Sequence, residues 1–173
     1  MTTRTTPVQE EIRGWFAGRM PDNWFQGPPS IDVDGDEILI VGRLDEPDVP
    51  EGASADTARV ARIKRFREET REARMAIADE AQRLFGRTVS WGAAVGEVQR
   101  LFTTLNVPVM TRLRMPERTV LDTLVQGGVA RSRSEALAWC VRLVGQHQSD
   151  WIADLQDALT HVQKVRGDGP MPL

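Results

Sequence analysis

The sequence predicts a mostly helical α+β protein, and three observations predict it. Apolar residues recur every three or four positions over 58–85 and again over 132–166, which is the helical period. The pair Asp34-Gly35 lies between two runs rich in β-branched residues and predicts a β-hairpin over 31–44. Residues 107–145 are typical of a short strand followed by two helices. We therefore expect an N-terminal helix and hairpin, long helices, and a C-terminal strand-helix-helix unit with an extended last helix.

Composition excludes several classes of protein. The chain has 173 residues, of which 40% are hydrophobic and 27% charged, as in an ordinary soluble globular protein. No segment approaches the roughly 20 apolar residues of a membrane span, and the first fifteen residues lack the apolar core of an export signal. One cysteine, Cys140, excludes an internal disulfide. We expect a cytoplasmic protein with no membrane contact, no structural metal and no cofactor.

Charge is distributed unevenly along the chain. Residues 1–58 hold four arginines against twelve acids, a balance of −8, whereas residues 59–173 hold eighteen bases against thirteen acids, a balance of +5. A basic region of this size suits a nucleic-acid binder. It is equally compatible with a solvated surface, so charge alone does not decide the function.

Residues 1–57 are expected to form an acidic N-terminal module. Residues 7–18 have the apolar face and the early Pro7 of a short amphipathic helix. The hairpin follows, and residues 45–57, which are acidic and contain Pro, Gly and Ser, are typical of a mobile linker. This module is a candidate for binding a protein partner.

Residues 58–105 are expected to form a helical hairpin. The first helix spans 58–85 and ends at Gly86; its i,i+4 pairs of opposite charge favour a solvated surface over a stripe that follows phosphates. A second helix is expected over 89–105, capped by Thr88 or Ser90.

Residues 107–166 are expected to form the C-terminal unit. A strand over 109–115 precedes a helix over 117–126, which Gly127-Gly128 closes. From Ser132 the helical pattern continues to about residue 166, and it leaves open whether the chain kinks or breaks near residue 149. The tail, residues 167–173, is expected to be disordered.

The strand carries the first candidate binding residues. Because side chains alternate along a strand, Met110, Arg112 and Arg114 would face outward together. A two-stranded ribbon fits the major groove of DNA, where arginine reads guanine edges or contacts phosphates. The simpler interpretation is that the two arginines keep an edge strand soluble.

The start of the next helix carries the second candidate site. Ser132 is in position to cap the helix, and Glu135 stands three residues later, as in a capping box. The free amides of a helix start favour an anion, and Arg131 and Arg133 flank them. A phosphate clamp and a plain helix cap are both compatible with this pattern.

Together the strand MTRLRMP (110–116), the helix ERTVLDTLVQGG (117–128) and the run RSRSEALAWCVRLV (131–144) resemble the ribbon-helix-helix family of DNA-binding proteins, typified by the CopG, Arc and MetJ repressors. The resemblance covers about 40 residues and implies a homodimer whose paired strands lie in the major groove. It further implies that Arg112 and Arg114 read bases and that the Ser132 helix start holds a phosphate. The whole chain is also similar to uncharacterised actinobacterial proteins.

The expected function is that of a sequence-specific DNA-binding protein and transcriptional regulator, with double-stranded DNA as its partner. The alternative is a dimeric adaptor that keeps the same core without binding DNA. No catalytic motif points to an enzyme. A strand over 38–44 could also pair with 109–115 inside one chain as a pseudo-dimer, which would replace the intermolecular ribbon.

Overall fold

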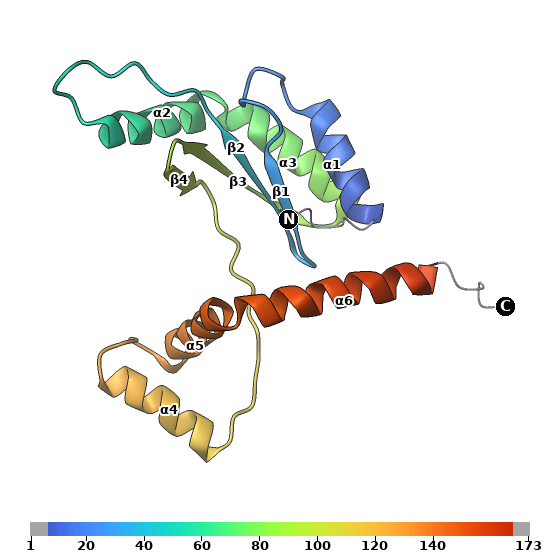
Figure 1. Ribbon diagram of the computed structural model, residues 1–173, viewed down its shortest axis with the longest axis vertical. Coiled ribbons are helices and arrows are strands. Elements are labelled where there is room, and N and C mark those ends of the chain that lie inside the picture. Colours follow the sequence, from blue (N-terminus) through green and yellow to red (C-terminus); the bar gives the residue numbers. More distant parts are fainter. Residues whose placement is uncertain (1–6, 168–173) are drawn as a thin grey trace. The chain divides into compact units, whose positions relative to one another are not determined.

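The computed structural model describes residues 7–167 and confirms the mostly helical α+β class (Figure 1). The chain divides into two compact units, with the boundary in the sequence between Pro108 and Val109. The first unit contains a four-stranded sheet, and the second contains helices. In the described part of the chain, no helix is both long and apolar enough to cross a membrane.

The first unit joins the two expected N-terminal modules into one sheet. The strand order is β1-β2-β3-β4; β1 and β2 are antiparallel, β2 and β3 parallel, and β3 and β4 antiparallel. Two helices form the crossover that a parallel pair requires. The elements are α1 (Pro7–Arg19), β1 (Ser30–Val33), β2 (Glu37–Arg43), α2 (Ala55–Glu69), α3 (Arg71–Phe85), β3 (Thr88–Val95) and β4 (Val98–Leu101).

The expected hairpin is confirmed, but its turn differs from the expected one. Gly35 does not have a positive φ, so the turn is not the type I′ that Asp-Gly favours. Instead the Asp34 carboxylate accepts the backbone N–H groups of Asp36 (2.8 Å) and Glu37 (2.7 Å). These two bonds lower the pKa of Asp34 below its usual value. The Asp34 carboxylate therefore shapes the turn.

One face of the sheet packs against all three helices of the first unit. Along β2 and β3, alternate residues face this side, so Ile38 and Ile40 lie beside Val89 and Trp91. Aromatic rings from α1 and the following loop complete the packing, with edge-on contacts to the Trp91 ring at 5.9–6.3 Å. The buried core consists of Ile12, Phe16, Met20, Ile31, Ile38, Ile40, Leu44, Ile63, Phe66, Ile77, Ala81, Val89, Trp91, Ala93, Val95 and Phe102.

The expected helix over 89–105 is wrong, because these residues form β3 and β4. Almost every residue of β3 is buried, so the polar–apolar alternation that marks a half-exposed strand is missing. Its small residues fit a central strand between two neighbours: a Cβ at Gly92 would come within 2.8 Å of the Leu101 side chain. At Gly96 the chain turns with a φ of 55°, which favours glycine, and β4 follows.

The expected single helix over 58–85 is two helices that meet at Thr70. The Thr70 hydroxyl donates to the Phe66 carbonyl at 2.6 Å, and the Arg74 guanidinium donates to the Arg67 carbonyl at 2.6 Å. Arg74 is buried, and burial together with the nearby charges of Arg67 and Arg71 lowers the pKa of its guanidinium to about 10. It remains charged at neutral pH and lies where the carbonyl groups at the end of α2 favour a cation.

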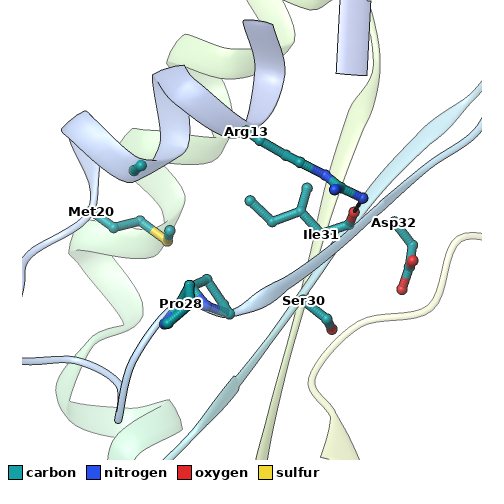
Figure 2. Close-up of a pocket in the computed structure, with 8 residues that line it drawn as sticks. Arg13, Met20, Pro28, Ser30, Ile31 and Asp32 are labelled. Carbon is teal, nitrogen blue, oxygen red and sulfur yellow. Dashed lines mark hydrogen bonds between the residues drawn. The ribbon is translucent and has the colours of Figure 1, made fainter. Parts of the chain in front are cut away.

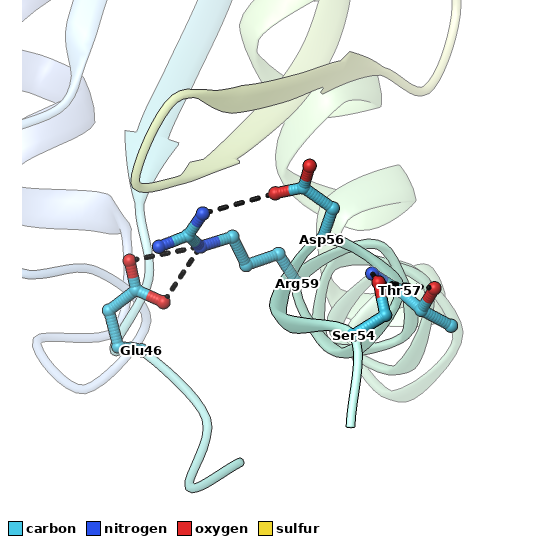
Figure 3. A network of polar contacts seen from close by, with 5 residues as sticks. All are labelled: Glu46, Ser54, Asp56, Thr57 and Arg59. Carbon is cyan, nitrogen blue, oxygen red and sulfur yellow. Dashed lines mark hydrogen bonds and ion pairs between the residues drawn. The ribbon is translucent and has the colours of Figure 1, made fainter. Parts of the chain in front are cut away.

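The segment expected to be a linker is fixed at both ends. Helix α2 begins earlier than expected, and Ser54 caps it by accepting the N–H of Thr57 at 3.3 Å. Arg59 pairs with Glu46 at 3.0 Å and with Asp56 at 3.1 Å (Figure 3). The expected surface pairs of α2 are also present, at 3.8 and 4.0 Å. Ion pairs therefore attach this acidic segment to the helix that follows it.

The pseudo-dimer within one chain is also wrong. Residues 38–44 largely coincide with β2, which pairs with β1 on one edge and β3 on the other. A strand has only two edges for backbone hydrogen bonds, so β2 has none left for residues 109–115.

The second unit contains α4 (Met115–Gln126), α5 (Arg133–His147) and α6 (Ser149–Gly167). Pro116 lies in the first turn of α4, and Gly128, with a φ of 75°, leads out of it. The chain breaks at Gln148, which separates α5 from α6 and answers the question that the sequence left open. The tail 167–173, apart from Gly167, lies outside the described residues.

Candidate nucleic-acid interface

The segment expected to be the ribbon strand has no strand partner in the described chain. Residues 103–114 form neither helix nor strand. Val109 and Met110 are 86% and 97% exposed, whereas Leu113 packs on the small core of the second unit. Arg118 of α4 donates to the Leu113 carbonyl at 2.8 Å and so ties the end of the segment to the helix. The segment is anchored at one end and open along its length.

Arg112 and Arg114 lie in this open segment. Both side chains are exposed, and neither forms a hydrogen bond or an ion pair with any residue of the described chain. The backbone of Arg114 is extended, with φ −82° and ψ 176°, and α4 begins directly after it. If the segment pairs as a strand, Arg112 and Arg114 lie on the same side, together with Met110. Two guanidinium groups without acidic partners are available for an anionic ligand.

The helix cap expected at Ser132 is confirmed. The Ser132 hydroxyl accepts the Glu135 N–H at 3.2 Å. The Glu135 carboxylate accepts the Arg131 N–H at 2.8 Å, one residue before the position that a standard capping box uses. The Arg131 side chain lies 3.9 Å from the Glu135 carboxylate and is 95% exposed. Arg131 is therefore accessible to solvent and to a ligand.

Arg133, the third residue of the expected phosphate clamp, is already paired. Its guanidinium forms two bonds with the Asp122 carboxylate of α4, at 2.6 and 2.7 Å. This bidentate pair lowers the pKa of Asp122 and raises the pKa of Arg133. No sequence pattern indicated the pair, since the two residues are eleven apart and lie on different helices. The pair uses two of the five guanidinium N–H groups, so Arg133 can still donate to a phosphate, but Asp122 already balances its charge.

The second unit has a small core and a large exposed apolar surface. Among the described residues, Leu121, Ala130 and Ala136 are the buried members of its core cluster, with several half-buried residues packed around them. Many large apolar side chains remain exposed on its segment and helices. They are Val109, Met110, Met115, Val120, Val129, Val141, Val144, Trp151, Leu155, Leu159, Val162 and Val165.

The first unit has a pocket that the sequence did not predict, beside the edge strand β1. It has a volume of about 370 Å³ and lies between α1 and the Pro28-Pro29 approach to β1 (Figure 2). Arg13 borders it and donates to the Ile31 carbonyl at 3.2 Å. Asp32 of β1 borders it on the strand side. Its only sequence signal is the pair of prolines, which also fits an ordinary loop.

Comparisons with known proteins match the two units separately. Residues 10–101 match the family described as the N-terminal domain of Rv1265-like protein, and residues 114–166 match the Mb1296 C-terminal domain. No ribbon-helix-helix family is detected, and no solved structure matches the chain.

Curated relatives match along most of the chain. Proteins named Uncharacterized protein Rv1265, from Mycobacterium tuberculosis H37Rv, and Uncharacterized protein Mb1296, from Mycobacterium bovis, are 56% identical to it over 156 residues. The match covers 90% of this chain and 69% of each relative. The chain therefore belongs to the Rv1265-like family.

Proposed function

We propose that this chain is a cytoplasmic, sequence-specific DNA-binding protein that acts as a dimeric transcriptional regulator and not as an enzyme. The observation that carries the proposal is the open segment 109–114. It pairs with no strand in the described part of its own chain, and it bears two exposed arginines that pair with no acid there. The same segment of a second copy would supply the missing strand partner, and the resulting antiparallel ribbon would carry four arginines.

The exposed apolar surface supports the homodimer. Val109 and Met115 would face the helices on the side of the ribbon opposite Arg112 and Arg114, yet both are more than 70% exposed. A second copy would cover these side chains, and burial of apolar area contributes roughly 25 cal/mol per Å² before association costs. Small domains of this kind commonly obtain a sufficient core only on oligomerisation.

Within the proposed complex, Arg112 and Arg114 read base edges. Met110, on the same side of the segment, also contacts the groove. The start of α5, with Ser132 at its cap and Arg131 beside it, holds a backbone phosphate. Arg133 adds its full charge to this contact only when it exchanges Asp122 for the phosphate.

The Arg133–Asp122 pair favours the alternative, a dimeric adaptor that does not bind DNA. It removes one cation from the proposed clamp and places a carboxylate next to it. In the adaptor, the second unit serves only as a dimer core, and the first unit binds a protein partner.

Binding to duplex DNA tests the proposal. The wild-type chain is used to select fragments from a genomic library at low salt, and the affinity of the selected duplex is measured by fluorescence anisotropy over a range of salt concentrations. The double variant Arg112→Ala/Arg114→Ala should lose specific binding, because it removes four guanidinium groups per dimer. The control Arg142→Ala/Lys164→Ala removes the same charge from exposed positions of the same unit and should retain most of the affinity.

Two results would contradict the proposal. One is the absence of binding to any duplex at low salt by a folded dimer, which would favour the adaptor. The other is an equal loss of affinity in both double variants, which would indicate a general effect of charge without a specific ribbon.

A further inference from the structure

Helix α6 carries an exposed apolar seam that its own unit leaves uncovered. Along α6, Trp151, Leu155, Ala158, Val162 and Val165 follow one another at alternating spacings of four and three residues, which is the heptad pattern of a coiled coil. All five are exposed, the four large ones by 46–62%. Within the second unit α6 packs against α5, and Figure 1 shows it extending away from that contact.

A long helix with an exposed apolar seam needs a partner that covers the seam. At 19 residues α6 is about 28 Å long, and a lone helix of that length is only marginally stable in water. Its apolar seam has the spacing of about 3.5 residues that matches another supercoiled helix, and Ile152 and Leu159 widen the seam on one flank. The pattern therefore indicates a helical partner.

We propose that this partner is α6 of a second copy of the chain, and that the two helices pair antiparallel. The inference rests on the proposed homodimer and names a surface through which copies associate. Two observations on α6 fix the direction: the sizes of the seam residues and the chemistry of the two flanks.

The sizes of the seam residues complement one another only in the antiparallel arrangement. With the helices centred between residues 156 and 157, Trp151 lies opposite Val162 of the second copy, and Leu155 lies opposite Ala158. Each of these layers then joins a larger side chain to a smaller one, which is the condition for dense packing, while Val165 lies beyond them because its counterpart would be Gln148, outside α6. A parallel pair would place two tryptophans in one layer and two alanines in another, with a gap between the alanines.

The residues on the two flanks of the seam also favour the antiparallel direction. One flank carries Asp154 and His161, and the other carries Ile152 and Leu159. In an antiparallel pair each flank meets its own copy, so Asp154 lies opposite His161 of the second copy, and Ile152 lies opposite Leu159. A parallel pair would bring the flank with Asp154 and His161 against the apolar flank, so the polar side chains would have no polar partner there.

Disulfide cross-linking tests both the partner and the direction. Two proteins are made in a Cys140→Ala background with tags of different size, one with Leu155→Cys and the other with Ala158→Cys. They are mixed, equilibrated and oxidised with oxidised glutathione, which accepts the two electrons when two thiols join. The antiparallel pair should give mainly the mixed 155–158 cross-link, because a disulfide forms only when the two Cβ atoms approach to about 4 Å.

Every other outcome overturns the inference. Cross-linking of the Leu155→Cys protein to itself at least as strongly as to the mixed partner would show a parallel pair. The absence of a cross-link, with circular dichroism unchanged, would show that the seam is covered within its own chain or by another molecule. Neither outcome depends on DNA, so failure here is distinguishable from failure of the proposed regulator.

Self-association provides a second measurement. The variant Leu155→Lys/Val162→Lys places charges in the seam and should raise the dissociation constant of the assembly at least tenfold in sedimentation experiments. The control Ala153→Lys/Gln156→Lys adds the same charge on the opposite side of α6 and should leave the constant within about twofold. Equal constants for the two variants would refute the seam.

Discussion

The pair between Arg133 and Asp122 provides the sharpest test of how this chain would hold a phosphate. The substitution Asp122→Asn keeps the shape of the side chain but removes the charge that holds Arg133 at 2.6 Å. Arg133 is then free to join Arg131 at the start of α5, and a carboxylate no longer lies beside the clamp. We therefore expect Asp122→Asn to bind DNA more tightly than the wild type.

The size of the effect follows from the additional bonds between arginine and phosphate. Each phosphate that a cation neutralises makes the slope of log K against log salt more negative by about 0.9. In a twofold dimer Arg133 of each subunit would neutralise one further phosphate, so the slope should steepen by about 1.8. At about 0.1 M salt the same relation raises the affinity roughly eightfold per phosphate and up to about sixtyfold for the dimer, if counterion release is the whole effect.

Anisotropy titrations of one duplex at four or more salt concentrations measure this slope. The control is Asp157→Asn, which removes one negative charge from an exposed position on α6 and leaves Arg133 paired. An unchanged slope in Asp122→Asn, with the Asp157→Asn slope also unchanged, would refute a role for Arg133 in the clamp. A weaker affinity would show instead that the ion pair positions α5 for binding.

Three further predictions concern the first unit and can be tested by thermal unfolding. Asp34→Ala should destabilise the protein at pH 7 but little at pH 2. The pKa of Asp34 is lower in the folded protein than in the unfolded chain, so the carboxylate stabilises the fold above the unfolded pKa, near 3.8. This stabilisation is lost as the pH falls through the folded pKa. Equal destabilisation at both pH values would contradict this. Gly96→Ala should lower the free energy of unfolding by about 1–3 kcal/mol, because φ is positive at this position. An added Cβ would also approach the Glu46 carboxylate of the Glu46–Arg59 pair to 2.7 Å. Unchanged stability would show that the pair moves aside. Trp91→Phe should cost less than the roughly 3–5 kcal/mol that truncation of a buried aromatic side chain to alanine usually costs. The buried Trp91 Nε1 has no hydrogen-bond partner among the described residues, and phenylalanine abolishes that unsatisfied donor. A loss of about 3–5 kcal/mol would indicate a bound water at this nitrogen.

The sequence predicted those elements whose signals are local. The hairpin over 31–44, the cap at Ser132 and the glycines after α4 each depend on a few neighbouring residues, and the structure has all of them. The helical period likewise identified 58–85, although the break at Thr70 depends on hydrogen bonds from two side chains that the period does not reveal.

The sequence failed where the structure depends on distant contacts. Residues 89–105 were predicted as a helix because polar and apolar side chains do not alternate along them. Alternation is missing because β3 lies between β2 and β4 and is buried along nearly its whole length. The Arg133–Asp122 pair and the pocket beside β1 arise from residues that the chain brings together only on folding. In the candidate interface, therefore, the exposure of Arg112 and Arg114 was predictable, whereas the pairing of Arg133 was not.

The structure removes one alternative and so sharpens the remaining choice. An unpaired segment that bears Arg112 and Arg114 had two candidate partners, β2 of the same chain or a second copy of itself. Because β2 uses both of its edges inside the sheet, it cannot complete a ribbon with this segment, and the proposed partner is the second copy. Measurement of the oligomeric state therefore precedes every other question: a monomer would have no ribbon to place in a DNA groove and no helix to cover α6. A dimer that retains the Leu155–Ala158 cross-link but binds no duplex would be an adaptor, and a dimer that also binds one through Arg112 and Arg114 would be a regulator.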